Sequence, residues 1–291
     1  MPLLLLSRRR ISMKNILIPT DFSENAWNAI EYALQFFSKS SCNFYLLHVN
    51  AVSAQVDATI AYNSNQNSDY EVLVKPAKVR LQEILYQINE RFPVNPKHRF
   101  FTISDSNYMI ESIRKQVEEK HIDLIVMGTK GESGLKKLPI GSNAGNVITK
   151  VKCTTMVVPE NAKYVKPKEI AFPTDFSIFC QPKVLQPITD IIEIHKAAVR
   201  VLHVNKYGDE LSEEQQRNKD YLNDYFGNYQ HSFHFLTNKH IEEAVQKFVD
   251  NREINLIAML AKNLNYFQKI LFYPTVKEIS YYKDIPFLVL H

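Results

Sequence analysis

The sequence predicts an α/β protein built from two tandem, doubly wound, parallel five-stranded sheets. Three observations support this fold class: segments of the first half return in the second half, short apolar runs alternate with amphipathic stretches, and the short runs are apolar throughout. Strands that are apolar at every position are buried on both faces, which is typical of a parallel sheet covered by helices. Such sheets bind ligands at the carboxyl ends of their strands.

The internal repeat is visible in three segments. NILIPTDFS at 15–23 returns as EIAFPTDFS at 169–177, LHVN at 47–50 returns at 202–205, and IDLIVM at 122–127 returns as INLIAM at 254–259. Matches that keep their order indicate a duplicated domain. We expect one domain at 13–160 and a second at 168–291, joined by a polar, proline-bearing linker at 161–167.

The first domain begins with an apolar run at 16–18, which predicts a strand that ends near Pro19. Ser23 is a candidate N-cap for the helix that follows. An apolar stripe with helical spacing supports that helix and consists of Ala26, Ala29, Ile30, Ala33, Leu34 and Phe37. We expect the remaining strands at 44–49, 99–103, 122–127 and 154–158, and the remaining helices at 75–91, 107–120 and 142–150.

The second domain repeats this alternation with fewer residues. The separation between matching segments falls from 155 to 132 residues after the second match, so the first domain contains 23 more residues. We place them in a loop at 51–70, which is rich in small and amide side chains. The amphipathic stripe of the second domain consists of Ile241, Ala244, Val245, Phe248 and Val249.

Residues 1–12 contain a leucine run followed by three arginines, the reverse of the order in a secretory signal. We assign this extension no role in the fold and regard Met13 as the natural start, with translation from Met1 as the alternative. The formal net charge is +4, and it is +1 without the three arginines, so we expect no nucleic-acid surface.

Two further function classes are excluded by composition and cysteine spacing. No apolar run reaches the roughly 18 residues that a membrane helix needs, so we expect no membrane partner. Cys42, Cys153 and Cys180 are too widely spaced for a disulfide framework or a zinc motif. We read them as packing residues of a cytoplasmic protein.

A glycine cluster carries the strongest functional signal. Five of the seven glycines lie between Gly128 and Gly145, directly after the strand IDLIVM and around the expected helix start at Ser142. Glycine lets the backbone approach a ligand closely, and the free amide groups of a helix start attract anions. This arrangement predicts a phosphate-binding loop, although its spacing is neither GxxxxGK(S/T) nor GxGxxG.

The spacing of Gly128, Gly131, Gly141 and Ser142 is G-x2-G-x9-G-(S/T), which resembles the ATP-binding signature of the universal stress protein family. PTDFS after the first strand, LLHV on the second and DLIVMG before the loop resemble that family as well. The resemblance implies an adenine nucleotide α-hydrolase-like fold with ATP, ADP or AMP as ligand, with or without Mg²⁺. It also implies that the last strands, 154–158 and 287–290, pair the two domains as an internal pseudo-dimer, with a homodimer as a further option.

The resemblance also implies which residues form the nucleotide site. Those expected near the adenine and ribose are Pro19, Thr20, Asp21 and Val49, the last through its backbone. Those expected beside the sugar are Met127 and Gly128. Those expected around the phosphates are Gly131, Gly141, Ser142, Asn143 and Ala144, with Lys130 available to offset phosphate charge.

Each of these assignments has a structural alternative. Asp21 can instead cap the helix that starts after Ser23, the glycines can serve only as turn residues, and Lys130 can be a solvated surface lysine. His48 and His203 recur at one repeat position within a strand, and we interpret them as hydrogen-bonded core residues rather than as catalytic groups.

The second domain lacks the glycine signature. At the separation of 132 residues, the four signature positions hold Leu260, Asn263, Tyr273 and Pro274. Bulky side chains occupy places where backbone would approach phosphate, and proline removes an amide donor. We therefore expect one nucleotide per chain and a second domain that acts as a structural partner.

The sequence favours a nucleotide-binding stress-response protein with a regulatory or protective role. One alternative is a slow Mg²⁺-dependent ATPase, although no base–nucleophile pair and no P-loop lysine accompany the glycine loop. Another alternative is an interaction module that binds no nucleotide. We expect no catalytic residues and no structural metal.

Overall fold

The computed structural model of the chain describes residues 13–50, 77–129, 141–205, 207–262 and 284–291. The expected extension at 1–12 and loop at 51–70 therefore lie outside the described residues. The same is true of Lys130, Gly131, Asn263, Tyr273 and Pro274.

The first half alternates strands and helices as the sequence predicts. Its elements are β1 (Lys14–Pro19), α1 (Glu24–Phe36), β2 (Cys42–Asn50), α3 (Ala77–Arg91), β3 (His98–Ser106), α4 (Met109–Glu119), β4 (Leu124–Gly128), α5 (Ser142–Lys150) and β5 (Thr155–Val158). The strands lie in the order β3-β2-β1-β4-β5, and every neighbouring pair among them is parallel. Ser23 caps α1 by accepting a hydrogen bond from the backbone amide of Ala26.

The second half repeats the same topology. Its described elements are β6 (Glu169–Pro173), α6 (Pro182–His195), β7 (Ala198–Asn205), α7 (Glu213–Tyr225), β8 (His231–Thr237), α8 (Ile241–Asn251), β9 (Leu256–Leu260) and β10 (Phe287–Leu290). The order β10-β9-β6-β7-β8 mirrors that of the first half, again with parallel neighbours. The linker expected at 161–167 falls between β5 and β6, and its role as a domain boundary stays a prediction.

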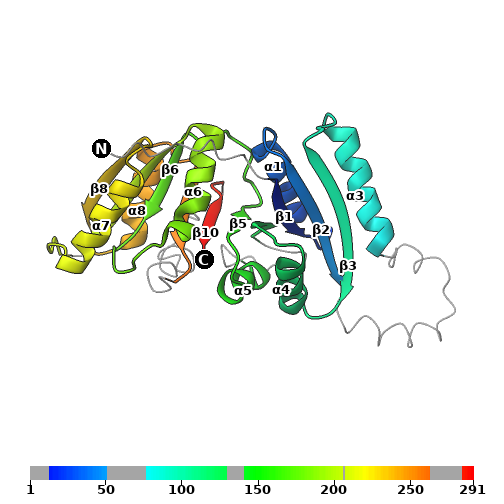
Figure 1. Cartoon of the computed structure of the whole chain (residues 1–291), viewed down its shortest axis with the longest axis horizontal. Helices are drawn as coiled ribbons and strands as arrows, with labels where there is room; N and C mark the ends of the chain where they lie inside the picture. Colours follow the sequence, from blue (N-terminus) through cyan, green and yellow to red (C-terminus); the bar gives the residue numbers. More distant parts are fainter. Residues whose placement is uncertain (1–12, 51–76, 130–140, 206, 263–283) are drawn as a thin grey trace, which may run out of the picture.

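The two halves meet at the centre of one continuous sheet (Figure 1). The described strands form a ten-stranded sheet in which β5 and β10 pair antiparallel, with Leu288 opposite Met156. This antiparallel pair is the seam between the halves and the only change of strand direction among the described strands. The predicted pseudo-dimer of two parallel five-stranded sheets is therefore confirmed.

The strands are apolar throughout because each face of the sheet carries its own core. Ile16 and Ile18 of β1 belong to one buried cluster, whereas Leu17 belongs to the other. The same alternation divides Leu288 from Val289 in β10. Each cluster contains residues of both halves, so the hydrophobic core crosses the seam and joins the halves into one packed unit.

Polar and aromatic contacts also cross the seam. The Lys14 ammonium group lies 2.6 Å from the Asp190 carboxylate, and the ring centroids of Phe36 and His195 are 4.4 Å apart. Tyr164, which follows β5, packs edge-on against Phe36. Burial, and then the nearby charges of lysine side chains, lower the pKa of His195 to about 4. The C-terminal ends of α1 and α6 thus meet at the seam.

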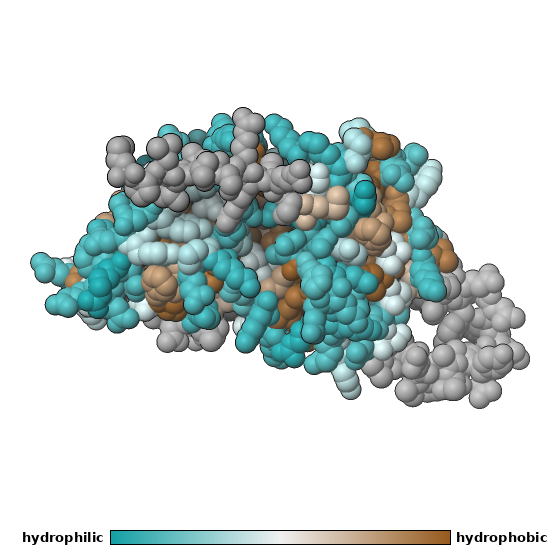
Figure 2. All heavy atoms as spheres, in the orientation of Figure 1, coloured by the Kyte–Doolittle hydropathy of each residue, from teal (hydrophilic) through white to brown (hydrophobic). Residues whose placement is uncertain are grey.

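Hydrophilic side chains cover most of the surface seen in Figure 2, and apolar side chains show in smaller areas between them. No helix among the described residues combines the length and apolar character needed to span a membrane.

Candidate functional site

The candidate site lies where the strand order reverses in the first half. β1 has β2 on one side and β4 on the other, and all three run parallel. Their carboxyl ends therefore meet at one edge of the sheet, which brings Pro19, Val49 and Gly128 to the same edge. Open α/β sheets bind ligands at such a switch point.

The PTDFS motif folds into a tight turn after β1. The Thr20 side chain accepts a hydrogen bond from the Phe22 amide at 3.0 Å, and the Asp21 carboxylate accepts from the Ser23 hydroxyl at 2.6 Å and the Ser23 amide at 3.1 Å. Phe22 has a φ of 67°, a left-handed conformation that is uncommon for an aromatic residue. These side-chain bonds hold that conformation in place.

The second half keeps the same turn in detail. Thr174 accepts from the Phe176 amide at 3.0 Å, Asp175 accepts from the Ser177 hydroxyl at 2.7 Å, and Phe176 has a φ of 57°. The turn therefore persists in the half that has lost the glycine signature. Its geometry accounts for the motif, and contact of Asp21 with a ligand stays a prediction.

The repeated histidines support this turn from the neighbouring strand. His48 Nδ1 lies 2.8 Å from the carbonyl oxygen of Thr20, and His203 Nδ1 lies 3.0 Å from that of Thr174. The His48 ring also packs against Phe22, with centroids 4.4 Å apart. Both histidines are hydrogen-bonded as expected, but only His203 is a buried core residue, whereas His48 is half-buried.

The backbone of Val49 faces the end of β1. Leu47 accepts a hydrogen bond from the Thr20 amide at 2.8 Å, so the Leu47 backbone points toward β1. Strand periodicity directs the Val49 backbone to the same side, two residues further on. The β1 ladder ends at Pro19 opposite Leu47, whereas β2 continues to Asn50. Val49 thus presents its amide and carbonyl groups beyond the end of β1.

Gly128 ends β4 in close contact with α1. A Cβ atom at this position would lie 2.9 Å from Asn25 Cγ and 3.0 Å from the Asn25 carbonyl oxygen. Asn25 was not among the predicted site residues, because no motif marks it. Only glycine fits here without displacing the first turn of α1.

The second half makes room for Leu260 at the equivalent position. The residue matching Glu24, where α1 begins, is Ile178, but α6 begins only at Pro182. The helix therefore starts four residues later, and the Leu260 side chain is buried in its half. The two halves therefore differ in local backbone as well as at this side chain.

The start of α5 lies beside the end of β4. The Gly141 amide donates to the Thr129 carbonyl at 2.6 Å, so the two described ends of the loop lie side by side. Gly141 is the N-cap of α5 and has no side chain to bond the amides of the first turn. Ser142 and Asn143 are exposed, whereas Ala144 is buried. A helix start with this arrangement can bind an anion through its amide groups.

Two predicted residues point inward rather than toward this edge. The Met127 side chain is 5% exposed and packs in the core with Leu17 and Val147, so only its backbone is available to a ligand. Thr20 is 6% exposed, and its hydroxyl serves the turn.

Arg80 of α3 is a further residue near the site that the sequence did not indicate. Its guanidinium carbon lies 4.0 Å from the centroid of the Phe22 ring, within cation–π distance. This contact brings a positive charge to the turn after β1. No sequence signal could have found it, because α3 is far from the motif along the chain.

In the second half, side chains of α7 donate hydrogen bonds to backbone carbonyl groups of the turn after β6. Gln215 donates a side-chain hydrogen bond to the Asp175 carbonyl at 2.7 Å, and the buried Asn218 donates to the Phe176 carbonyl at 2.8 Å. The turn after β6 is therefore tied to protein side chains.

The cysteines show no sign of reactive chemistry. Cys42, Cys153 and Cys180 are buried free thiols, and burial raises the pKa of each to about 12. A thiolate is disfavoured in such surroundings. Within the described residues, no group of three or more histidine, cysteine or acidic side chains could hold a metal ion.

Comparison with known proteins gives consistent matches. A family model described as the universal stress protein family matches residues 13–159. Two universal stress proteins of Methanocaldococcus jannaschii are each 28% identical to this chain, over 153 and 155 residues. These alignments cover 52% and 51% of this chain and 84% and 96% of the relatives.

The likeness in fold extends over both halves. The crystal structure of a universal stress protein from Archaeoglobus fulgidus superposes with a TM-score of 0.58 at 17% sequence identity. The superposition covers 94% of this chain and 97% of that chain.

Proposed function

The chain belongs to the universal stress protein family, and we propose that it binds one adenine nucleotide, at the edge of its first half where β1, β2 and β4 end. ATP is the ligand we favour, with ADP and AMP as alternatives. The bound nucleotide would regulate the protein's partners in a stress response. The three buried thiols suit a reducing compartment, and we propose the cytoplasm.

The observation that carries this proposal is the hydrogen bond from the Gly141 amide to the Thr129 carbonyl. It holds the start of α5 beside the end of β4, so the amide groups of the first helical turn lie near the carboxyl end of that strand. Helix-start amides and a close backbone approach are what a phosphate group requires. We assign this role to Gly128, Gly141, Ser142 and Asn143, together with Lys130 and Gly131 outside the described residues.

The adenine and ribose would lie nearer to β1 and β2. The outward-facing backbone of Val49 offers one donor and one acceptor, which suits the edge of an adenine ring. Arg80, stacked on Phe22, would add a positive charge on the same side. Two features of the second half support a single nucleotide site per chain. Leu260 replaces the glycine at the strand end, and α7 side chains bond the turn after β6.

Ser142→Pro is the most direct test of this site. Ser142 is the first residue of α5, where proline is tolerated because the amide takes no part in the helix. Gly141 has φ −69° and ψ 162°, which is the conformation favoured before proline. The variant should therefore fold and lose one amide donor. A hydrogen bond to a charged group contributes about 1.5–3 kcal/mol, so we expect the Kd for ATP to rise about 10-fold or more.

Ser142→Ala is the matched control, since it keeps the amide and should weaken ATP binding less than proline does. Calorimetric titration would give both affinities, and native mass spectrometry would give the stoichiometry. Equal affinity in Ser142→Pro and the unaltered chain would contradict the assigned site. Two nucleotides per chain would contradict the single-site proposal, and none would favour an interaction module.

A slow Mg²⁺-dependent ATPase is the second candidate. Steady-state phosphate release that falls in parallel with ATP affinity in Ser142→Pro would favour it.

A further inference from the structure

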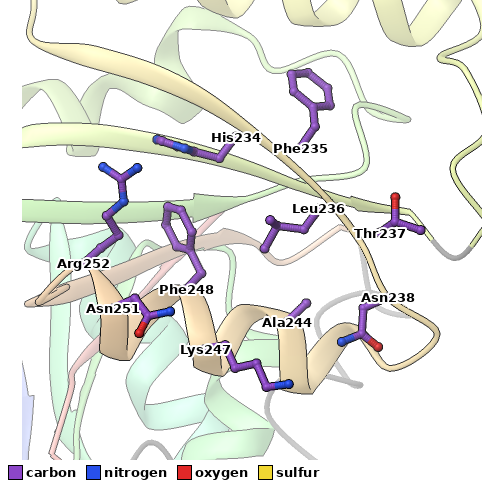
Figure 3. A pocket seen from close by; sticks show the side chains of 10 residues that line it. All are labelled: His234, Phe235, Leu236, Thr237, Asn238, Ala244, Lys247, Phe248, Asn251 and Arg252. Atoms are coloured by element: carbon purple, nitrogen blue, oxygen red, sulfur yellow. The ribbon is translucent and has the colours of Figure 1, made fainter.

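A cavity of about 400 Å³ lies between β8 and α8 in the second half (Figure 3), several strands away from β4 in the sheet. This volume is within the range of about 300–1,000 Å³ that is common for small-molecule sites. The cavity belongs to the half that lacks the glycine signature.

The floor of the cavity is apolar. Leu236 of β8 points toward α8, and Ala244 and Phe248 face it from the helix (Figure 3). The Phe248 ring packs against the His234 ring, with centroids 4.9 Å apart and planes tilted by 55°. The Phe248 ring thus forms the aromatic part of the lining, and an aromatic ring favours contact with a planar ring of a ligand.

One wall of the cavity is formed by β8, the edge strand of the sheet. β8 is the last strand in the order, and its Gln230 carbonyl accepts from the Val199 amide of β7. Strand periodicity therefore turns the backbones of Phe235 and Thr237 away from β7, toward the cavity mouth. Their side chains point away from α8 (Figure 3), so these two residues line the cavity with backbone amide and carbonyl groups.

The charged side chains of the lining are both cations. Lys247 and Arg252 line the cavity, and no acidic side chain is among its lining residues in the described part of the chain. The Arg252 guanidinium carbon lies 5.9 Å from the centroid of the Phe248 ring. Burial, and then the charges of Arg252 and Arg200, lower the pKa of His234, whereas Glu169, which pairs with Arg200, acts in the opposite direction.

The equivalent place in the first half has a different chemistry. Asp105 of β3 stands at the position of Leu236, and its carboxylate accepts a hydrogen bond from the Ser112 hydroxyl at 2.8 Å. Glu119 and Gln116 of α4 correspond to Asn251 and Phe248. At this place the second half thus lacks both carboxylates of the first half and has an aromatic ring instead of a glutamine. Both halves have a lysine and a second cationic side chain here. This difference favours an anionic ligand in the second half only.

We propose that the cavity between β8 and α8 binds a small organic anion made of a flat ring and a carboxylate or phosphate group. The ring lies against Phe248, Leu236 and Ala244. The anionic group meets Arg252, whose planar guanidinium suits both anions, and Lys247 at the rim adds to the positive potential. The edge backbone of β8 supplies further hydrogen bonds.

Methyl-labelled NMR of the full chain tests this proposal, with the Leu236 and Ala244 methyl groups as reporters inside the cavity. The probes are 2-naphthoate, 2-naphthyl phosphate and the neutral 2-naphthamide. We expect both anions to shift the two reporter signals and the amide to bind at least about 10-fold more weakly, as for loss of one charge-assisted contact. Comparison of the two anions identifies the preferred group.

Arg252→Gln should weaken the binding of the better anion by about 10-fold, and Lys247→Gln should weaken it less. The matched control is Arg217→Gln on α7, an exposed arginine 3.8 Å from Glu213, which removes the same charge away from the cavity. The proposal is overturned if the amide binds as well as the anions, or if Arg217→Gln weakens binding as much as Arg252→Gln. It is also overturned if neither anion shifts the reporters while an extended acidic peptide does, since β8 would then be a peptide-binding edge.

Discussion

Protonation of His195 should destabilise the seam between the two halves at mildly acidic pH. This residue ends α6, is 5% exposed and packs against Phe36 of α1. Within the described residues, its Nε2 atom is buried and has no hydrogen-bond partner. Burial, followed by the charges of Lys166 and Lys39, lowers its pKa to about 4. The folded chain therefore holds the imidazole neutral in a place that disfavours its charged form.

The sign and size of the effect follow from the two pKa values. A histidine in the unfolded chain has a pKa of about 6.5, so between pH 6.5 and 4 the unfolded state binds more protons than the folded state. The contribution of the neutral His195 side chain to the free energy of unfolding is fully present above about pH 6.5 and is lost as the pH falls through 4. Relative to neutral pH, titration of His195 should lower the free energy of unfolding by about 2 kcal/mol at pH 5 and by about 3 kcal/mol at pH 4.

Urea unfolding at pH 7.5, 6 and 5 would measure this loss in the unaltered chain and in His195→Phe. Phenylalanine keeps a ring beside Phe36 and removes the titrating group. The variant should match or exceed the unaltered chain at pH 7.5, and should lose about 2 kcal/mol less between pH 7.5 and pH 5. His240→Asn replaces an exposed histidine at the start of α8 and serves as the control. If His195→Phe has the same pH dependence as the unaltered chain, the assignment to His195 is wrong.

Two further predictions concern packing. Gly128→Ala should lower the free energy of unfolding by about 1–3 kcal/mol, because the added Cβ atom meets Asn25. Adding Asn25→Ala should restore only part of the loss, since the Asn25 carbonyl remains 3.0 Å away, and full restoration in urea unfolding would show that the backbone contact is unimportant. The thiols of Cys42, Cys153 and Cys180 should react with a thiol-specific dye at pH 8 only after unfolding, because burial raises each pKa to about 12; rapid labelling of the folded chain would refute this.

The repeat in the sequence made the fold predictable. Segments such as PTDFS and LHVN recur because the turn and its supporting histidine are needed in each half. Phe22 and Phe176 share a left-handed backbone, and His48 and His203 each contact the carbonyl oxygen of the threonine in their own turn. A strand apolar at every position could be assigned to a parallel sheet, because cores lie on both faces.

The candidate site was less predictable, because its side chains come from elements that no motif connects. Asn25 explains the need for glycine at position 128, and Arg80 reaches Phe22 from α3, which is distant from the motif in the sequence. Met127 was expected beside the sugar, but its side chain lies in the core. Spacing patterns report which backbone positions must be small, and they do not report which side chains approach them from other elements.

The divergence between the halves is selective, and this selectivity bears on what each half does. The second half preserves the turn after β6, the histidine contact and the seam strand β10, all of which stabilise the shared sheet. It differs at the strand end, where Leu260 accompanies a later helix start, and along α8, where Phe248 and Asn251 replace polar or acidic residues. Random loss of function would affect contacts of both kinds. Retention of the structural contacts, together with a cavity that lacks the carboxylates of the first half, is what we expect if the second half binds a different anion on the same scaffold.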